Sequence, residues 1–201
     1  IDLNIDFLAG SGHKLCGPTG IGFLWSRKEI LEKIPPLFGG GEMIQDVFEE
    51  TSTWAELPHK FEAGTPAIAE AIGLAEAINY INNIGLNEIH EYEKTITKYL
   101  FEKLNQIENI EIIGPSPEID PDRASLATFY IKNIHSNDIA EILDSKGICI
   151  RSGHHCCQPL HRYIGIKSTA RISMNFTTNK EEIDMFIEKL KDTIDFLKIN
   201  S

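Results

Sequence analysis

The feature that most limits the fold is the alternation of amphipathic helices and short apolar strands after residue 85. Residues 88–107 carry an apolar stripe at three- and four-residue steps, which predicts a helix: Ile89, Tyr92, Ile96, Leu100, Leu104 and Ile107. Further along, the pattern predicts strands at 126–131, 148–150 and 170–175, a helix capped by Ser136 and ended by Gly147, and a last helix opened by a Thr178–Glu181 capping box. Residues 88–201 therefore fit an α/β or α+β domain of two layers.

The first 85 residues have a different character. Strands are expected at 3–9 and 21–25, on either side of a glycine-rich loop at 10–20. Ser26 and Glu29 predict a capped helix through residue 34, and residues 39–64 look irregular, as either a functional loop or a flexible excursion. A helix opened by Thr65 and Pro66 is small or apolar on nearly every face, so we expect it to be buried against a sheet or a partner subunit. Gly85 ends this helix, and a domain boundary is expected there.

Composition and charge narrow the class of partner. The chain has 201 residues, of which 42% are hydrophobic and 24% charged, as in ordinary globular proteins, and its net charge is −11. Such a surface repels phosphate backbones and anionic lipid, so neither nucleic acid nor a membrane is expected as a partner. No apolar run approaches a membrane span and no leader opens the chain, although a first residue of Ile1 suggests a fragment or a processed product. The four cysteines form no spaced disulfide framework, which indicates a reducing, cytoplasmic compartment.

A loop at residues 151–160 concentrates reactive side chains. Its sequence, RSGHHCCQPL, places the thiol of Cys156 beside His154, His155 and Arg151. Electropositive neighbours favour the thiolate, which is the reactive form of cysteine, so we interpret the loop as functional rather than as an inert polar loop. An alternative interpretation of the loop is a zinc site with the ligands His154, His155, Cys156, Cys157 and His161. Adjacent residues diverge in direction and no second ligand pair follows, so no metal is expected.

Two basic residues elsewhere are candidates with open alternatives. Lys14 follows a strand within Ser11-Gly12-His13-Lys14, a setting that suits an anionic group such as a phosphate, although a loop lysine taken alone is more often a surface residue. The nucleotide-binding motif GxxxxGK[ST] is absent. Arg171 lies in an apolar strand and should have a carboxylate partner, either an internal Asp or Glu or a bound substrate.

Taken together, these stretches resemble the second half of cysteine desulfurases of the SUF type, within the class-V aminotransferase group of pyridoxal-phosphate enzymes. The resemblance spans nearly the whole chain, and RSGHHC followed by QPL is its most specific part. The matching stretches, in the family's order, are SGHKLCGPTGIGFLW (11–25), GGGEMI (39–44), KFEAGTPAIAEAIGLAEAI (60–78), RSGHHCCQPL (151–160) and TARISMNFTTN (169–179).

The resemblance implies a fold-type-I α/β architecture, with residues 1–85 as the C-terminal part of the large cofactor domain and 86–201 as the small C-terminal domain. It implies that Lys14 carries pyridoxal 5'-phosphate covalently, that Ser11 and His13 contact the phosphate, and that Thr65 reaches the cofactor of a neighbouring subunit in a homodimer. Arg171, with Arg151 nearby, would hold the carboxylate of L-cysteine. Cys156 matches the nucleophile that takes the substrate sulfur as a persulfide, leaving L-alanine.

The resemblance also sets expectations about partners and about what is missing. A SufE-like acceptor would receive the persulfide sulfur for iron–sulfur cluster assembly. His154 and His155 would favour the thiolate or protonate the carbon fragment, with their roles open, and Cys157 is expected to be a bystander. The family's other cofactor contacts lie N-terminal to the lysine, so this chain is expected to hold an incomplete site. The alternatives are a selenocysteine lyase, a non-catalytic dimerisation or docking fragment, and a class-V enzyme that uses no thiol.

Overall fold

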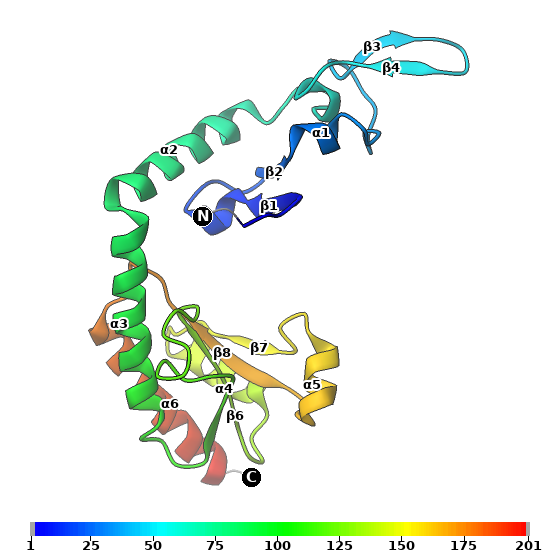
Figure 1. Cartoon of the computed structure of the whole chain (residues 1–201). Helices are drawn as coiled ribbons and strands as arrows, with labels where there is room; N and C mark the ends of the chain where they lie inside the picture. The colour runs from blue at the N-terminus through cyan, green and yellow to red at the C-terminus, as the bar shows by residue number, and fades with distance from the viewer. Residues whose placement is uncertain (1–2, 200–201) are drawn as a thin grey trace. The chain divides into compact units, whose positions relative to one another are not determined.

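The computed structural model of the protein describes residues 3–199. The chain divides into two compact units, Ile1–Gly85 and Leu86–Ser201, each shown in Figure 1. The division falls at the glycine that ends the helix α2 (Ile68–Ile84), where the sequence analysis expects a boundary. The further assignment of these units to a large cofactor domain and a small domain stays a prediction.

The second unit is built on a four-stranded antiparallel sheet (Figure 1). Its strands, in the order β5-β6-β8-β7, are β5 (Ile110–Ile113), β6 (Leu126–Ile131), β8 (Thr169–Ser173) and β7 (Arg151–Gly153). Side chains alternate along β6, where Ala127, Phe129 and Ile131 are buried and the residues between them are half-exposed. One face of this strand is therefore turned to the core, as the period of two requires.

Three helices complete this core. They are α3 (Leu86–Leu104), α4 (Ser136–Ser145) and α6 (Lys180–Ile199), and their apolar stripes pack together with the buried residues of the sheet. The two-layer arrangement is confirmed, and so is the middle of the predicted helical stripe, with Ile96, Leu100 and Leu104 almost fully buried. The helix ends at Leu104, so the predicted stripe residue Ile107 lies beyond it, and Tyr92 is 40% exposed. A short helix, α5 (Gln158–Ile164), lies between β7 and β8 along the chain.

Several boundaries in this unit differ from the predictions. The strand expected at 148–150 begins at Arg151 instead, and β5 was not predicted. The helix α4 is capped by His135, whose Nδ1 accepts the Asn137 amide, because the Ser136 hydroxyl bonds to Ser168. The capping box of α6 is formed by Asn179 and Glu182, one residue beyond the predicted pair. The Glu182 backbone N–H donates to the Asn179 side-chain oxygen, and the Asn179 backbone N–H donates to the Glu182 carboxylate.

The first unit is assembled from short elements. β1 (Phe7–Ser11) pairs with β2 (Gly22–Ser26), and the 3-10 turn η1 (Gly12–Leu15) lies between them. The predicted helix through residue 34 is only α1 (Lys28–Leu31), with no side-chain cap, so the capping box expected there is wrong. The stretch expected to be irregular contains a hairpin, β3 (Ile44–Val47) with β4 (Ser52–Trp54), and a second 3-10 turn, η2 (His59–Phe61).

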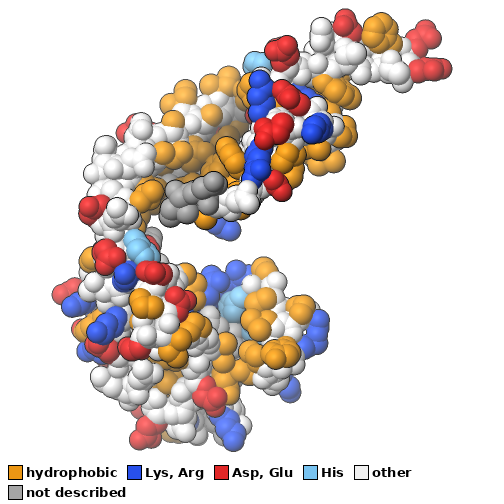
Figure 2. All heavy atoms as spheres, in the orientation of Figure 1, with side chains coloured by type: hydrophobic (Ala, Val, Ile, Leu, Met, Phe, Trp, Pro, Cys, Tyr) orange, Lys and Arg blue, Asp and Glu red, His pale blue; other side chains and the backbone are white. Residues whose placement is uncertain are grey.

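This unit buries little apolar surface. Within residues 3–85 the buried hydrophobic side chains are Met43, Leu74 and Ala77. The helix α2 begins at Ile68 rather than at the predicted Thr65–Pro66, and Ile72 is 68% exposed. Residues 3–85 leave much of this helix uncovered, and its predicted burial against a sheet or a partner subunit stays a prediction. Figure 2 shows hydrophobic side chains over much of its visible surface. In the part of the chain that the structure describes, no helix is both long and apolar enough to cross a membrane.

Candidate active site

The Cys156 loop joins β7 to α5 through an unusual backbone. Gly153 has φ 106°, and the two non-glycine residues His155 and Cys156 have φ 51° and 64°. Left-handed conformations cost about 1–2 kcal/mol for residues with a Cβ, so surrounding contacts must hold them. The Cys157 amide donates to the His154 carbonyl at 2.9 Å, and the Cys157 thiol donates to the same oxygen at 3.1 Å. The Cys157 thiol is therefore hydrogen-bonded within the loop, whereas Cys156 is exposed.

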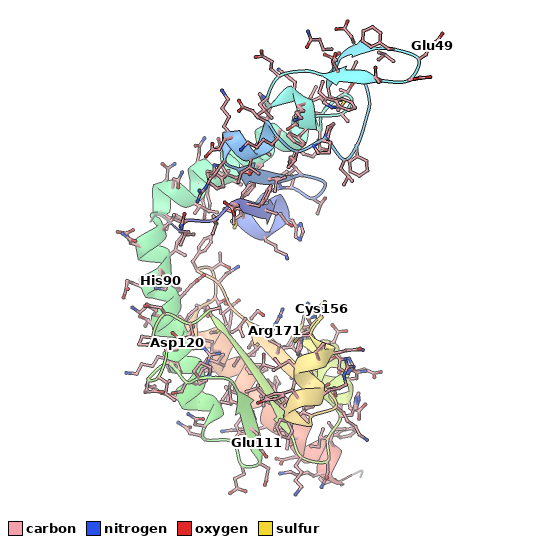
Figure 3. All side chains as sticks on the ribbon, turned by 45° about the vertical axis from the view of Figure 1, so that its right-hand side comes forward. Glu49, His90, Glu111, Asp120, Cys156 and Arg171 are labelled. Atoms are coloured by element: carbon pink, nitrogen blue, oxygen red, sulfur yellow. The ribbon has the colours of Figure 1, made fainter. Side chains whose placement is uncertain are left out.

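Arg151 contacts the exposed thiol directly. Its Nη2 donates to Cys156 Sγ at 3.1 Å, a contact that spans the whole turn of the loop. A guanidinium in this position suits a sulfur that carries negative charge, because charge-assisted hydrogen bonds are the stronger ones. The predicted proximity of Arg151 to the Cys156 thiol is confirmed, and the functional role of the loop stays a prediction. Figure 3 shows Cys156 at the loop before α5 and Arg171 on the adjacent strand β8.

Arg151 and Arg171 are cross-strand partners in the β7–β8 ladder. Arg171 donates from Nε to the Ser173 hydroxyl at 3.1 Å. Among the described residues, neither arginine forms an ion pair with an Asp or Glu. Like charges directly opposite each other destabilise a sheet. Of the two alternatives for Arg171, an internal carboxylate partner is not found among the described residues, and a bound substrate carboxylate stays a prediction.

A buried hydrogen-bonded network lies behind the loop. His155 Nε2 lies 2.9 Å from the Thr169 hydroxyl and 3.1 Å from the Thr169 carbonyl oxygen. His161 Nε2 lies 3.0 Å from the same hydroxyl, and its Nδ1 lies 3.2 Å from the Cys157 carbonyl oxygen. His155 Nδ1 is buried without a hydrogen-bond partner in the described chain. Burial first, then the charge of Arg171, lowers the pKa of His155, which keeps its ring neutral.

Sequence patterns predict only part of this network. They indicate His161 only as a possible zinc ligand and give no signal for Thr169, because its place beside the loop depends on strand pairing between residues distant in sequence. His154 is exposed, and its ring meets that of His161 edge-on at 5.3 Å between centroids. Within residues 3–199, no group of three or more His, Cys, Asp or Glu side chains is arranged to hold a metal ion.

The Lys14 site lies in the first unit, on η1 directly after β1. Ser11 precedes this turn without using its side chain as a cap, and His13 and Lys14 are exposed. The turn is tightly packed underneath, since a Cβ added at Gly12 would lie 2.7 Å from Ile21 Cγ2. A hydroxyl, an imidazole and a primary amine thus lie together on a rigid turn. That donor set fits pyridoxal phosphate, whose phosphate accepts hydrogen bonds and whose aldehyde condenses with a lysine.

Thr65 lies elsewhere in the same unit. It is exposed, follows Gly64 with φ 79°, and lines an open hollow of about 440 Å³. The other residues of this hollow are Glu42, Pro58, His59, Glu62, Gly64 and Pro66. Ser11 therefore ends β1, His13 and Lys14 follow directly on η1, and Thr65 lines a hollow whose other residues include none of these three. Lys14 and Cys156 belong to different compact units.

Comparison with known families identifies the class of protein. The model of the aminotransferase class-V family matches residues 1–186, and the chain belongs to this family.

The nearer similarities are to cysteine desulfurases. A probable cysteine desulfurase of Synechocystis sp. is 53% identical over 194 residues, which are 96% of this chain and 46% of that protein. Two solved structures have TM-scores of 0.89 over 96% of this chain: the apo cysteine desulfurase of Thermococcus onnurineus, at 39% identity over 48% of its length, and CsdA of Escherichia coli, at 32% over 47%. The expected partial α/β fold of these enzymes is confirmed.

The chain spans about half the length of the curated relatives it matches. These shares measure how much of each relative is matched and not its place in that protein. The assignment to the C-terminal half therefore stays a prediction.

Proposed function

We propose that this chain is part of a cysteine desulfurase that converts L-cysteine to L-alanine and leaves the sulfur as a persulfide on Cys156. The observation that carries the proposal is the 3.1 Å contact between Arg151 Nη2 and the exposed Cys156 Sγ, with Arg171 opposite Arg151 on the next strand. The similarity to proteins named cysteine desulfurases supports it.

The proposed reaction uses three residues at the thiol loop and on the adjacent strand: Arg151, Cys156 and Arg171. Arg171, assisted by Arg151, holds the substrate carboxylate through the planar fork of its guanidinium. The Cys156 thiolate attacks the sulfur of L-cysteine, so that an S–S bond forms and the Cβ–S bond breaks. The electron pair of that bond stays on the carbon fragment, which takes up a proton and leaves as alanine. Cys157 takes no part, because its thiol is engaged by the His154 carbonyl.

The turn at Lys14 is the proposed site of pyridoxal 5'-phosphate. When bound, this cofactor supplies an electron sink that stabilises negative charge at the substrate Cα. Ser11 and His13 would hold the phosphate, and Thr65 would hold that of a second subunit. The Lys14 amine, on a turn that packing keeps rigid, would bind the cofactor and carry protons to and from the substrate.

We propose further that residues 1–201 alone hold an incomplete cofactor site. Relatives are about twice as long, and the first unit leaves large apolar side chains uncovered, such as Phe38, which is 73% exposed. Exposed apolar surface on this scale is typical of a surface that another part of the protein covers. We therefore expect this chain by itself to bind the cofactor weakly and to turn over slowly.

The partners follow from the same proposal. The enzyme would act as a homodimer in the cytoplasm and pass its persulfide sulfur to a SufE-like acceptor for iron–sulfur cluster assembly. The acidic chain, with net charge −11, is suited to neither nucleic acid nor anionic membrane surfaces. Selenocysteine lyase activity is the nearest alternative, because the same thiol and cofactor serve either chalcogen. A strict selenocysteine lyase would leave L-cysteine unchanged.

The first experiment is cofactor labelling. Pyridoxal phosphate is added to the chain and to a version extended at its N-terminus, the product is reduced with borohydride, and the modified lysine is mapped by mass spectrometry. We expect Lys14 to be labelled strongly in the extended protein and weakly in this chain, and Lys14→Ala to remove the label. Labels scattered over surface lysines in both proteins would contradict the proposed cofactor site. A well-folded dimer that releases no alanine would instead favour a docking fragment.

A further inference from the structure

One threonine hydroxyl is connected to the residues on both sides of Cys156. His155 Nε2 lies 2.9 Å from Thr169 Oγ1 and 3.1 Å from the Thr169 carbonyl oxygen, which can only accept, so this nitrogen donates. On the other side, the Cys157 carbonyl oxygen can also only accept, so His161 donates to it from Nδ1 at 3.2 Å. His161 Nε2 lies 3.0 Å from the same Thr169 hydroxyl. Residues 155 and 157 are therefore both connected to one side chain of β8.

Thr169 is placed to act as a fixed anchor. It is 1% exposed, and its backbone pairs with Gly153, the last residue of β7, at the point where the loop leaves the sheet. His161, which forms the connection from Cys157, is 4% exposed. Hydrogen bonds in such a setting are stronger than exposed ones, because the effective dielectric constant is low inside the protein.

The backbone of the loop needs such an anchor. His155 and Cys156 have φ 51° and 64°, and residues with a Cβ keep these left-handed conformations only where their surroundings hold them. Within the loop, the Cys157 amide donates to the His154 carbonyl at 2.9 Å, and Arg151 Nη2 donates to Cys156 Sγ at 3.1 Å. The hydrogen bonds to Thr169 join this turn to a buried residue of the sheet.

We propose that Thr169 is a positioning residue: through His155 and His161, its hydroxyl holds Cys156 in the left-handed conformation that places the thiol at Arg151. Thr169 itself makes and breaks no bond. This deepens the proposed function, on which it rests, by assigning a residue that orients the nucleophile without contacting the substrate. A loop released from Thr169 would present the sulfur in many orientations, which slows its attack on the substrate sulfur.

Hydrogen exchange of the loop is the direct test. The reporter is the Cys157 amide, which closes the turn around Cys156. We expect Thr169→Val, which has the same shape without the hydroxyl, to speed its exchange about tenfold while the amides of β6 keep their protection. Thr169→Ser, which keeps the hydroxyl, should behave as the wild type. Unchanged exchange in Thr169→Val, or equal exchange in the Val and Ser variants, would overturn the proposal.

The matched control is Thr193→Val. Thr193 is also fully buried, and its hydroxyl donates to the Lys189 carbonyl at 2.7 Å, within α6. Its replacement removes a buried threonine hydroxyl without touching the loop, so the exchange of the Cys157 amide should stay as in the wild type. Equal acceleration in Thr193→Val and Thr169→Val would reject a specific role of Thr169.

A measurement on the wild type requires no variant to fold. Long-range ¹H–¹⁵N NMR of the ¹⁵N-histidine-labelled chain distinguishes the two tautomers of each histidine. We expect near neutral pH that His161 carries a proton on Nδ1 and His155 carries one on Nε2, as their carbonyl partners require. A His161 whose single proton is on Nε2 would overturn the proposal, because the ring could not donate to the Cys157 carbonyl.

The catalytic consequence is measured in the enzyme extended to full length. In a single turnover with L-cysteine, Thr169→Val should slow the formation of the Cys156 persulfide by about 10- to 100-fold. The L-cysteine concentration that gives half of the maximal rate should stay unchanged, because Arg171 still holds the carboxylate, and Thr169→Ser should restore the rate. A raised half-saturating concentration at an unchanged maximal rate would reject the positioning role.

The exchange and tautomer measurements require neither cofactor nor substrate. If they give the expected results and no persulfide forms from L-cysteine, the desulfurase proposal is rejected and the anchoring of the loop by Thr169 is kept. If Thr169→Val forms the persulfide as fast as the wild type, only the role given to Thr169 is rejected.

Discussion

Arg151 and Arg171 face each other across the β7–β8 ladder, and neither forms an ion pair with a described Asp or Glu. Two guanidiniums opposite each other in a sheet, with no carboxylate between them, repel each other and lower the stability of the sheet. Such an arrangement is typical of a site that binds an anion, since the bound anion relieves the repulsion. This pairing is the reason that the proposed function assigns Arg171 and Arg151 to the carboxylate of L-cysteine.

Removal of the Arg171 guanidinium should therefore raise the stability of the fold and weaken the binding of substrate. We expect Arg171→Met, which keeps the aliphatic stem, to raise the free energy of unfolding by about 0.2–1 kcal/mol because it removes a like-charge pair. Urea denaturation measures this change. In the enzyme extended to full length, the same variant should raise the KM for L-cysteine. Arg162→Met, on the exposed surface of α5, is the matched control and should change neither. A marked loss of stability in Arg171→Met would reveal an internal partner.

The two adjacent cysteines should behave differently. We expect Cys156→Ser to abolish the persulfide formed from L-cysteine in the extended enzyme, because a hydroxyl cannot hold sulfane sulfur. Cys157→Ser should keep most of it, since the Cys157 thiol is engaged by the His154 carbonyl at 3.1 Å. Mass spectrometry of the loop peptide after substrate addition measures both. If Cys156→Ser retained full activity, the enzyme would be a class-V member that uses no thiol.

The tight turn below Lys14 predicts a local packing effect. In Gly12→Ala the new Cβ would lie 2.7 Å from Ile21 Cγ2 and 3.0 Å from the Ile21 carbonyl oxygen. We expect the overpacking to cost about 1–3 kcal/mol and to displace η1. Hydrogen exchange of residues 11–22 and borohydride labelling of Lys14 are the measurements. Gly39→Ala is the control, because a Cβ there meets nothing within 4 Å. Equal effects of the two substitutions would contradict this account of the turn.

The neutral state of His155 predicts a pH dependence of stability. Burial and the two nearby arginines lower its pKa in the folded protein below the ordinary value of 6.5. As the pH falls below 6.5, the unfolded chain binds a proton that the folded chain does not, so the free energy of unfolding should decrease. The decrease should end once the pH has fallen past the lowered folded pKa. We expect His155→Gln to remove this contribution, which chemical denaturation at pH values on both sides of 6.5 measures. Parallel curves for the two proteins would contradict the lowered pKa.

The core of the second unit should respond to loss of volume. Phe129 is fully buried on β6 and lies 6.5 Å from Phe186 between ring centroids. We expect Phe129→Ala to destabilise the unit by about 3–5 kcal/mol through lost transfer energy and a residual cavity. Phe196→Ala, at a ring that is 56% exposed, should cost far less. Urea denaturation followed by circular dichroism compares them, and similar costs would mean that the two rings are equally buried in solution.

The sequence by itself determined the helical stripes, the strand at β6 and the chemistry of the thiol loop. These are local properties, since periodicity needs only one segment and Arg151, His155 and Cys156 lie within six residues. Capping was harder to predict. Asn179 rather than Thr178 pairs with Glu182, and Ser136 bonds to Ser168, because competing hydrogen-bond partners are known only once the chain has folded. The predicted burial of α2 against a sheet or a partner subunit stays a prediction, because an apolar helix shows that a surface needs covering but not which part of the protein covers it.

The tertiary structure alone decided which distant residues meet. The register of β7 against β8 places Arg151 opposite Arg171, and a shift of one residue would turn each side chain to the other face. The same register brings Thr169 behind the loop, where its hydroxyl joins His155 to His161. Pairing between strands depends on long-range contacts that no local pattern records. The sequence therefore predicted which reactive residues share the loop, and the fold decided which distant side chains surround them.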